Sequence, residues 1–306
     1  TASTNTGVGY FALNANTTGA SNVAVGAYSL DANTTSANNV AVGVSALGAN
    51  TGANNTAVGN EALQVNTTGT LNTAVGGAAL DANTTGSSNT AVGRAALGAN
   101  TTGEKNTALG AAALALGTTG DRNVAIGNYS MADATVTGNQ NTAVGDNTLR
   151  EITSGTLNTA LGCEAGYNIT TGSNHTAIGF RAVYSVTTGT NLTGVGYYAL
   201  KSNTTGTNSV AVGLQALQAN TEGHNNTAVG LEALQTNTTG DGNTAVGTGA
   251  LALATTANDN TAVGRAALGL NTTGHSNVGI GQGALDANTT GYYNNAIGRH
   301  SLGANT

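Results

Sequence analysis

A short repeat accounts for the whole chain and limits what it can fold into. The pentapeptide Asn-Thr-Ala-Val-Gly, or a close variant, recurs 18 times in 306 residues. Its glycine returns every 17 residues, apart from one step of 16 between Gly43 and Gly59 and one of 18 between Gly127 and Gly145. We number the positions of the consensus N-T-A-V-G-x-x-A-L-x-A-N-T-T-G-x-x from 1 to 17 and call each repeat a coil. A repeat of this kind decides the architecture before any other signal does.

The period and the composition together predict an all-β chain, a parallel β-solenoid or β-roll of 18 coils with a 17-residue repeat. A coil is too short for a pair of helices, which needs about 33 residues. The two glycines and several Asn and Thr residues in each coil also oppose helix formation. One coil would therefore form one rung, stacked on the next at about 4.8 Å. Because 18 coils of 17 residues make 306, we expect a single array over 1–306 without a linker or a second domain.

Side-chain alternation predicts which positions face inward. Position 4 is Val, Leu or Ile in every coil, and position 2 is Thr or Val in all but one. These positions share a strand face, and position 9 is nearly always Leu, so we expect positions 2, 4 and 9 to line the interior. Val25, Val42 and Val58 would then lie above one another inside the coil. Position 3, always Ala or Gly, would lie on the other face of the strand.

Polar residues also recur in columns. Asn fills position 1 in 15 of 18 coils, and Thr fills position 13 in every coil, from Thr17 to Thr306. Identical polar side chains stacked at this spacing can hydrogen-bond along the stack, as Asn ladders do in cross-β structures. Of the 22 charged residues, 19 occupy positions 6, 7, 10, 16 and 17, so we expect these five columns to face solvent. Coils 8 to 10 depart most from the consensus, with an extra residue within 131–138 and Arg-Glu-Ile at 150–152.

The same columns also indicate whether the chain is stable as a monomer or needs to pack against further copies. A coil of this size encloses few apolar side chains, and thin structures bury a small share of their surface. The small residues at positions 3 and 8 favour a second packing surface, so we expect a homo-oligomer packed side by side. The alternative is a monomeric two-sheet solenoid whose Ala columns face each other across a narrow core. Thr306 at position 13 would lead into Thr1 at position 14, so we also expect a longer array or end-to-end stacking of copies.

The motif at positions 1 to 5 carries a family resemblance. The runs at 22–26 (NVAVG) and 123–127 (NVAIG) resemble the head repeats of trimeric autotransporter adhesins and are similar to repeat regions of phage tail fibres. The resemblance covers the whole chain through these positions, although the familiar head repeat is shorter than 17 residues. In those heads the motif builds a left-handed parallel β-roll within a homotrimer displayed outside the cell. The resemblance therefore implies a trimer at a cell surface or on a virion appendage.

One group of non-repetitive residues is a candidate ligand-binding site. Five rings are expected on the solvent face of coils 10 to 12, at positions 6, 7 and 10: Tyr167, Phe180, Tyr184, Tyr197 and Tyr198. An exposed aromatic patch on a rigid scaffold suits a glycan or a protein of a host surface. The alternative is stacking between coils that stabilises an exposed sheet. We interpret a smaller pair, Phe11 and Tyr28 at position 7, as such a ladder.

Signals for chemistry are weak, and no catalytic residue, metal ligand or cofactor is predicted. Cys163 is the single cysteine, which excludes an intrachain disulfide, and we expect it to be a buried or half-buried thiol. His175 replaces a ladder Asn, which favours a structural role. We therefore do not expect an enzyme. The remote alternative is a tailspike-like, glycan-cleaving enzyme with Asp146 and Glu164 as its carboxylate pair.

Charge and hydropathy narrow the partners. With a net charge of −6, the chain lacks the excess of basic residues that is typical of nucleic-acid-binding proteins. No apolar run approaches the roughly 18 residues of a membrane helix, so we expect no membrane insertion in this segment. The repeat favours a passive, stiff, extracellular fibre or adhesin segment that mediates attachment or filament assembly. The alternative is an ice-binding solenoid that uses the Thr ladder at position 13, although the adjacent Thr at position 14 would point to the opposite face.

Overall fold

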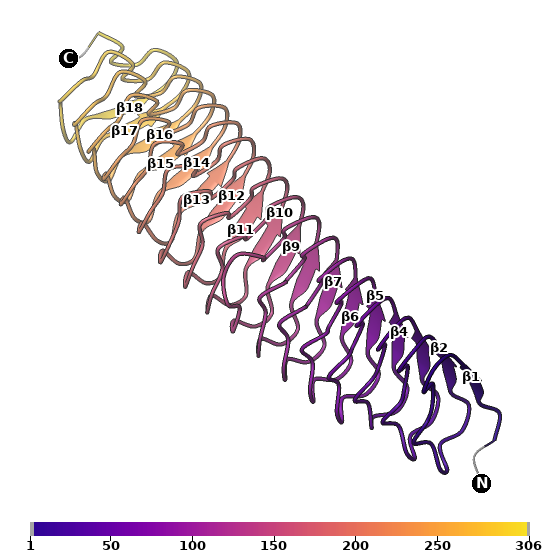
Figure 1. Cartoon of the computed structure of the whole chain (residues 1–306). Coiled ribbons are helices and arrows are strands. Elements are labelled where there is room, and N and C mark those ends of the chain that lie inside the picture. The colour runs from indigo at the N-terminus through magenta and orange to yellow at the C-terminus, as the bar shows by residue number, and fades with distance from the viewer. Residues whose placement is uncertain (1–2, 305–306) are drawn as a thin grey trace. The chain divides into compact units, whose positions relative to one another are not determined.

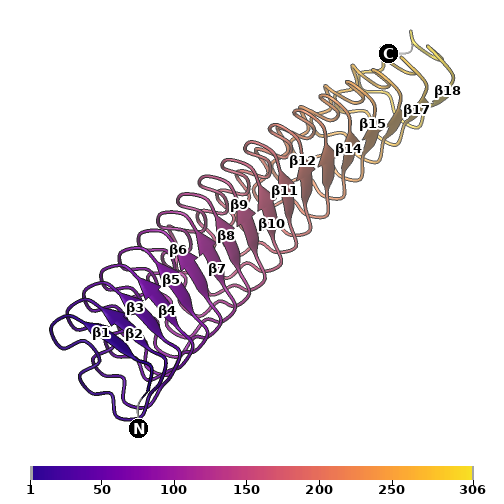
Figure 2. The same ribbon diagram turned by 90° about the vertical axis from the view of Figure 1, so that its right-hand side faces the viewer.

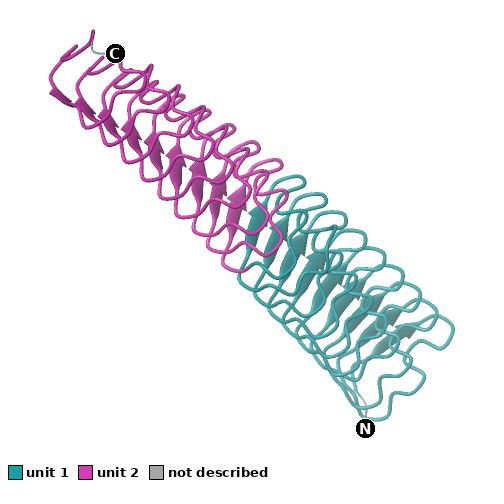
Figure 3. Ribbon diagram, turned by 90° about the vertical axis from the view of Figure 1, so that its left-hand side faces the viewer, with its two compact units in different colours: residues 1–155 teal, residues 156–306 magenta. Residues whose placement is uncertain are grey.

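The computed structural model describes residues 3–304, and these are all-β as the repeat predicts. The chain divides into two compact units, Thr1–Gly155 and Thr156–Thr306, drawn in teal and magenta in Figure 3. In each unit every coil contributes one three-residue strand followed by a run of turns (Figure 1). The prediction of a parallel β-solenoid with a 17-residue repeat is confirmed.

The strands occupy positions 2 to 4 of their coils. In the first unit they are β1 (Thr6–Val8), β2 (Val23–Val25), β3 (Val40–Val42), β4 (Thr56–Val58), β5 (Thr73–Val75), β6 (Thr90–Val92), β7 (Thr107–Leu109), β8 (Val124–Ile126) and β9 (Thr142–Val144). In the second unit they are β10 (Thr159–Leu161), β11 (Thr176–Ile178), β12 (Thr193–Val195), β13 (Val210–Val212), β14 (Thr227–Val229), β15 (Thr244–Val246), β16 (Thr261–Val263), β17 (Val278–Ile280) and β18 (Asn295–Ile297).

Neighbouring strands within each unit pair in parallel without any shift of register, and Figure 2 shows them stacked in chain order. Val25 lies beside Val42, and Val42 lies beside Val58. The irregular steps do not disturb this pairing. Across the 16-residue step Val40 still pairs with Thr56, and β8 pairs with β9 at the same positions across the 18-residue step. The turns therefore absorb the missing and the additional residue.

The interior is lined by other positions than the sequence indicated. Position 3 faces inward, and its alanines are fully buried, as at Ala41 and Ala57, together with position 9, as at Leu47. Positions 2 and 4 face outward, and Val42 and Val58 are each 37% exposed. The expected inner stack is therefore wrong for positions 2 and 4 and confirmed for position 9.

The narrowness of the coil explains this inversion. A Cβ placed on Gly194, at position 3, would lie 2.6 Å from Val183 Cγ2 and 3.2 Å from the carbonyl oxygen of Ala199. The strand stands so close to the opposite wall that only Ala or Gly fits between them, and the Leu that nearly every coil carries at position 9 fills the remaining space. A closely packed position tolerates no change of volume, whereas an outward one does. The constancy of position 3, beside the exchange of Val, Leu and Ile at position 4, is the signal that could have shown this.

The small residues at positions 3 and 8 do not form an outer packing surface. Both columns are buried within the chain, as at Ala57 and Ala62, which agrees with the alternative of a narrow Ala-lined core. The expected second sheet is nevertheless missing, because turns build the wall opposite the strands throughout residues 3–304. These columns therefore give no reason to expect an oligomer.

Two columns of asparagine form part of the interior. At position 1 the backbone N–H of Asn89 donates to Asn72 Oδ1 at 2.9 Å, one coil before. At position 12 the side chain of Asn83 donates to Asn66 Oδ1 at 2.7 Å and to the carbonyl oxygen of Gly86 at 3.0 Å. These side chains are buried, so the ladders satisfy polar groups that water does not reach. The ladder at position 1 is confirmed, and the ladder at position 12 is an addition.

The Thr column at position 13 lies nearer the surface and also links successive coils. Thr67 Oγ1 donates to the carbonyl oxygen of Thr84 at 2.9 Å, and Thr84 Oγ1 donates to that of Thr101 at 3.0 Å. The expected hydrogen bonding along the stack is therefore confirmed, with backbone carbonyls rather than neighbouring hydroxyls as the acceptors.

Glycine at position 5 ends each strand and sets how closely the coils stack. Gly93 has a φ of +137°, and a Cβ there would lie 2.3 Å from the carbonyl oxygen of Gly110 in the next coil. Both the backbone conformation and the close approach exclude any side chain. This explains why all 18 coils keep glycine at this position.

Candidate functional site

The five aromatic residues predicted as a binding site come together on the surface of the second unit. The ring centroids of Tyr167 and Tyr184 lie 5.2 Å apart, and those of Phe180 and Tyr197 lie 5.5 Å apart. Tyr198 completes the group, with its centroid 4.1 Å from that of Tyr197. Positions 6, 7 and 10 lie in the turns after the strand, and the regular register brings equal positions of successive coils above one another.

Charged side chains are built into the same cluster. Arg181 Nε donates to Glu164 Oε2 at 2.5 Å, and the Arg181 guanidinium carbon lies 5.3 Å from the centre of the Tyr184 ring. Lys201 Nζ lies 4.3 Å from the centre of the Tyr198 ring. Exposed cation–π contacts of this kind contribute about 0.5–1 kcal/mol each. The cluster is therefore held together by its own charges as well as by its rings.

The two neighbouring phenols differ in acidity. A hydrogen bond with Tyr197 lowers the pKa of Tyr198, and the charges of Lys201 and Arg181 act in the same direction. The same hydrogen bond raises the pKa of Tyr197. The hydrogen bond with Glu164 raises the pKa of Arg181. The acidity of both phenols is therefore set by contacts within the cluster.

The rings of this cluster cover one another's faces. The planes of Tyr167 and Tyr184 differ by 27°, and those of Phe180 and Tyr197 by 22°, so each pair is stacked along the coils. Stacking of a flat ligand needs a free ring face, because the electron-rich face is the attractive surface. The geometry therefore fits a stabilising ladder, the alternative that the sequence left open, better than a platform for a sugar.

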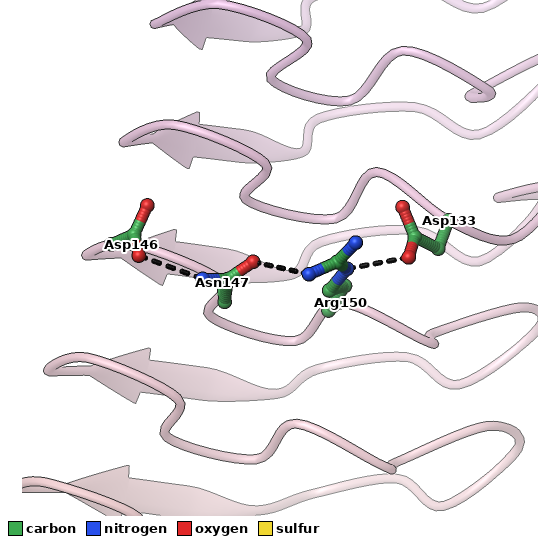
Figure 4. Close-up of polar contacts among 4 residues, drawn as sticks. All are labelled: Asp133, Asp146, Asn147 and Arg150. Carbon is green, nitrogen blue, oxygen red and sulfur yellow. Dashed lines mark hydrogen bonds and ion pairs between the residues drawn. The ribbon is translucent and has the colours of Figure 1, made fainter.

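The carboxylates of the remote enzyme alternative both have surface partners. Asp146, in the first unit, accepts a hydrogen bond from Asn147 Nδ2 at 2.7 Å, and Glu164, in the second, forms the ion pair described above. Figure 4 shows that Asn147 in turn accepts from Arg150 Nη1 at 2.6 Å, while Arg150 Nε donates to Asp133 at 2.5 Å. The contacts in Figure 4 run along one turn and reach Asp133 in the coil before, as charges on solvent-facing columns commonly do.

His175 takes the place of a ladder Asn, as its position predicts. Its backbone N–H donates to Asn158 Oδ1 at 3.0 Å, its Nε2 lies 2.9 Å from the carbonyl oxygen of Gly189, and its Nδ1 accepts from the N–H of Leu192 at 3.3 Å. Burial lowers the pKa of His175 to about 4. The ring is therefore neutral at pH 7 and acts as a structural link between coils.

Other chemical groups are sparse in the described part of the chain. Within residues 3–304 no three His, Cys, Asp or Glu side chains lie close enough together to hold a metal ion. No helix long and apolar enough to cross a membrane occurs in that range. Cys163 is exposed because position 6 faces outward, so the expected burial of this thiol is wrong.

Two surface features were not predicted from the sequence. One is the outward strand face, where positions 2 and 4 present Thr and Val, as at Thr56, Val58 and Val75. The other is a pair of hollows above positions 7, 10 and 11, about 550 Å³ beside Tyr28 in the first unit and about 510 Å³ beside Leu270 in the second. The signal for the hollows is a small residue in column 10, Gly48 and Gly269 respectively, flanked by larger neighbours.

Comparisons with known proteins add no family to this description. No protein-family model matches the chain, and no curated protein matches it. What the chain does must therefore be argued from its own columns, which are a buried Ala, Leu and Asn interior, charged turns and an apolar strand face.

Proposed function

We propose that this chain is a passive structural segment of an extracellular fibre or adhesin that associates with further copies of itself through the outward strand face. The single observation that carries the proposal is the exposure of Val, Leu and Ile at position 4 in coil after coil, as at Val25, Val75 and Leu109. A continuous apolar face of this kind on a soluble protein marks an interaction surface.

The repeat itself argues that the partner is another copy of this chain. A second solenoid has the same 17-residue period, so its rungs can match those of the first along the whole face. A partner with another period would lose register after a few rungs. Position 3 is buried and cannot take part, which leaves positions 2 and 4 to make the contact. The resemblance to adhesin head repeats supports three copies and a place at a cell surface or on a virion appendage.

Measurement of molar mass in solution tests this proposal. We expect light scattering to give a multimer for the native chain, and a monomer for a variant in which Val58 and Val75 are both replaced by Lys, because the strand face would then carry repelling charges. The control variant carries Asn60→Lys and Asn128→Lys at position 6 and is expected to remain a multimer. A native chain that is monomeric at micromolar concentration contradicts the proposal.

A second candidate, ice binding, is favoured by one observation on the same face. Thr at position 2 and Val at position 4 point outward together, as at Thr73 and Val75, and make two regular columns on one sheet. The Thr column at position 13 is less suited, because its hydroxyl protons already donate to backbone carbonyls. Thermal hysteresis distinguishes this candidate, and its absence removes it.

A further inference from the structure

The hollow in the first unit is lined by residues of three successive coils, those of β2, β3 and β4. Its lining is Tyr28, Asp31, Ala32, Ser45, Gly48, Ala49, Gln64 and Val65, around a volume of about 550 Å³. We propose that this hollow binds one pyranose ring of a neutral saccharide. The inference rests on the attachment role proposed above and gives it a ligand class. It uses positions 7, 10 and 11 of the coil, which are distinct from the strand face at positions 2 and 4.

One wall of the hollow is an aromatic ring with a free face. Phe11 stacks on Tyr28 with a centroid distance of 5.8 Å and an interplanar angle of 11°, and Tyr10 meets the same ring edge-on at 5.5 Å. Both contacts come from the coil before. At the same position of the next coil stands Ser45, so the column of rings stops there and the other face of Tyr28 borders the hollow. The C–H face of a pyranose can continue this column as a third ring, because C–H groups are attracted to the electron-rich face.

The floor and the opposite wall supply hydrogen-bonding groups. At position 10, Asp31 is followed by Gly48 in the next coil. A Cβ on Gly48 would lie 3.5 Å from Asp31 Oδ1, so the carboxylate lies beside the space that a side chain at position 48 would occupy. Ser45 adds a hydroxyl, and Gln64 in the following coil adds a carboxamide. Sugar hydroxyls both donate and accept, and a carboxylate accepts their protons in strong, charge-assisted bonds. A mainly apolar hollow with a few convergent polar groups is the usual composition of a small-molecule site.

Two other places in the molecule show why both elements are needed. The hollow in the second unit holds a carboxylate, Asp286, but its walls are aliphatic, with Leu253 and Leu270 and no aromatic ring. The cluster around Tyr184 has rings whose faces are already covered. An organic cation is the other ligand that suits an aromatic ring beside a carboxylate. A saccharide fits better because Tyr28 is the one ring among the residues that line the hollow, which does not make a cage, and the opposite wall is neutral.

Saturation-transfer difference NMR on the intact chain tests the proposal with lactose, maltose, cellobiose and N,N′-diacetylchitobiose at millimolar concentration. We expect transfer to the ring protons of at least one disaccharide. Tyr28→Phe keeps the ring face and should change affinity by less than about threefold, whereas Tyr28→Ala should lower it about tenfold. Asp31→Asn should lower it about threefold through the loss of charge-assisted hydrogen bonds.

The decisive variant is Ser45→Tyr, which places a third ring where the sugar would stack. The chain already carries Tyr at position 7 with the same backbone conformation, since φ is 59° at Tyr28, 61° at Tyr198 and 56° at Ser45. The variant should therefore fold, as thermal melting can verify, and should lose saccharide binding. Its matched control is Ala266→Tyr at position 7 beside the other hollow, which should bind as the native chain does.

Three results would overturn the proposal. The first is that none of the four disaccharides receives transferred saturation. The second is that Ser45→Tyr binds saccharide as the native chain does. The third is that tetramethylammonium binds in a way that depends on Tyr28 while the sugars do not bind. Saccharide binding and self-association are tested separately. A multimer that binds no saccharide refutes only the saccharide site, and a monomer that binds one refutes only the self-association.

Discussion

Position 12 of the coil differs between two parts of the molecule. In the first unit Asn66, Asn83 and Asn100 form a buried ladder, with Nδ2 to Oδ1 distances of 2.7 and 2.8 Å. In the second unit Ile169 and Val186 occupy the same position and are equally buried. The strands pair in the same register in both places. One backbone therefore accepts either a column of hydrogen-bonded amides or an apolar one.

Unpaired amide atoms occur where an Asn at position 12 adjoins a coil that carries another residue there. Asn100 Oδ1 is buried without a hydrogen-bond partner where the next coil carries Gly117. Asn203 lacks partners for both of its amide atoms where the coil before carries Val186. Asn83, between two Asn neighbours, is paired on both sides. Asn100 and Asn203 have unpaired atoms at the ends of their runs, and Asn33 Oδ1 is also unpaired although Asn50 follows it.

The largest effect is expected from breaking the ladder in its middle. Asn83→Ile should lower the free energy of unfolding by about 3–5 kcal/mol, because it leaves Asn66 Oδ1 buried without its donor and takes one acceptor from Asn100 Nδ2. Urea-induced unfolding measures the loss. The control Ile169→Val, which trims an apolar column, should cost about 1 kcal/mol. Equal losses for the two variants would show that the ladder is not the stabilising element.

The next effect comes from His175, where a titratable ring replaces a ladder amide. Burial lowers its pKa in the folded chain from 6.5 to about 4, so the unfolded chain takes up a proton first as the pH falls. Stability is therefore complete above pH 6.5 and is lost progressively down to about pH 4, by up to about 3 kcal/mol. Unfolding curves at several pH values measure this. His175→Asn should remove that part of the pH dependence, and a variant with the native profile would exclude this assignment.

The opposite exchange should have a somewhat smaller effect. Ile169→Asn introduces an amide beside Val186, which offers it no hydrogen-bond partner, although the carbonyl of Gly172 can accept one bond as Gly86 does in the ladder. We expect a loss of about 2 kcal/mol in urea-induced unfolding. Ile169→Leu serves as the control for shape. A stability equal to that of the native chain would mean that position 12 accepts isolated amides.

The smallest effect is a gain from repairing a ladder. Asn237 Oδ1 has no hydrogen-bond partner where the next coil carries Ala254, and the same coil carries Ala257 in place of Gly at position 15. In the coil of Asn237, a Cβ on Gly240 at position 15 would lie 2.4 Å from Asn237 Oδ1. By the same geometry an Asn at 254 needs Gly at 257, in its own coil. The double variant Ala254→Asn with Ala257→Gly should gain about 1 kcal/mol.

The single variant Ala254→Asn is the matched control for this repair. It meets the Cβ of Ala257 and should gain nothing or lose stability in the same denaturation experiment. A double variant no more stable than the single one would show that the two positions are not coupled.

The architecture could be predicted from the sequence, but which strand positions face the interior and which face solvent could not. Period, glycine spacing and charge columns predict the solenoid, its register and its solvent-facing turns, because each depends on residue type at a fixed interval. Which face of a three-residue strand points inward depends on the width of the coil, and no single residue encodes that width. The predicted inward side of Val42 is therefore wrong, whereas its predicted stacking between Val25 and Val58 is confirmed.

The candidate sites divide in the same way. The sequence brought Tyr167, Phe180 and Tyr197 to one surface, because equal positions in successive coils must stack. It could not show that their faces cover one another, since that depends on side-chain rotation. The hollow beside Tyr28 escaped notice because what makes it is a missing side chain, Gly48, among larger neighbours.

The hydrogen bonds that run from coil to coil reach one coil in each direction, as the series Thr67, Thr84 and Thr101 illustrates. Removal or duplication of an entire coil would bring equal positions together again and keep the backbone register. In the gene, this corresponds to unequal recombination in blocks of 17 codons that preserves the reading frame. The length of such an array can thus change between generations while the strands still stack in register.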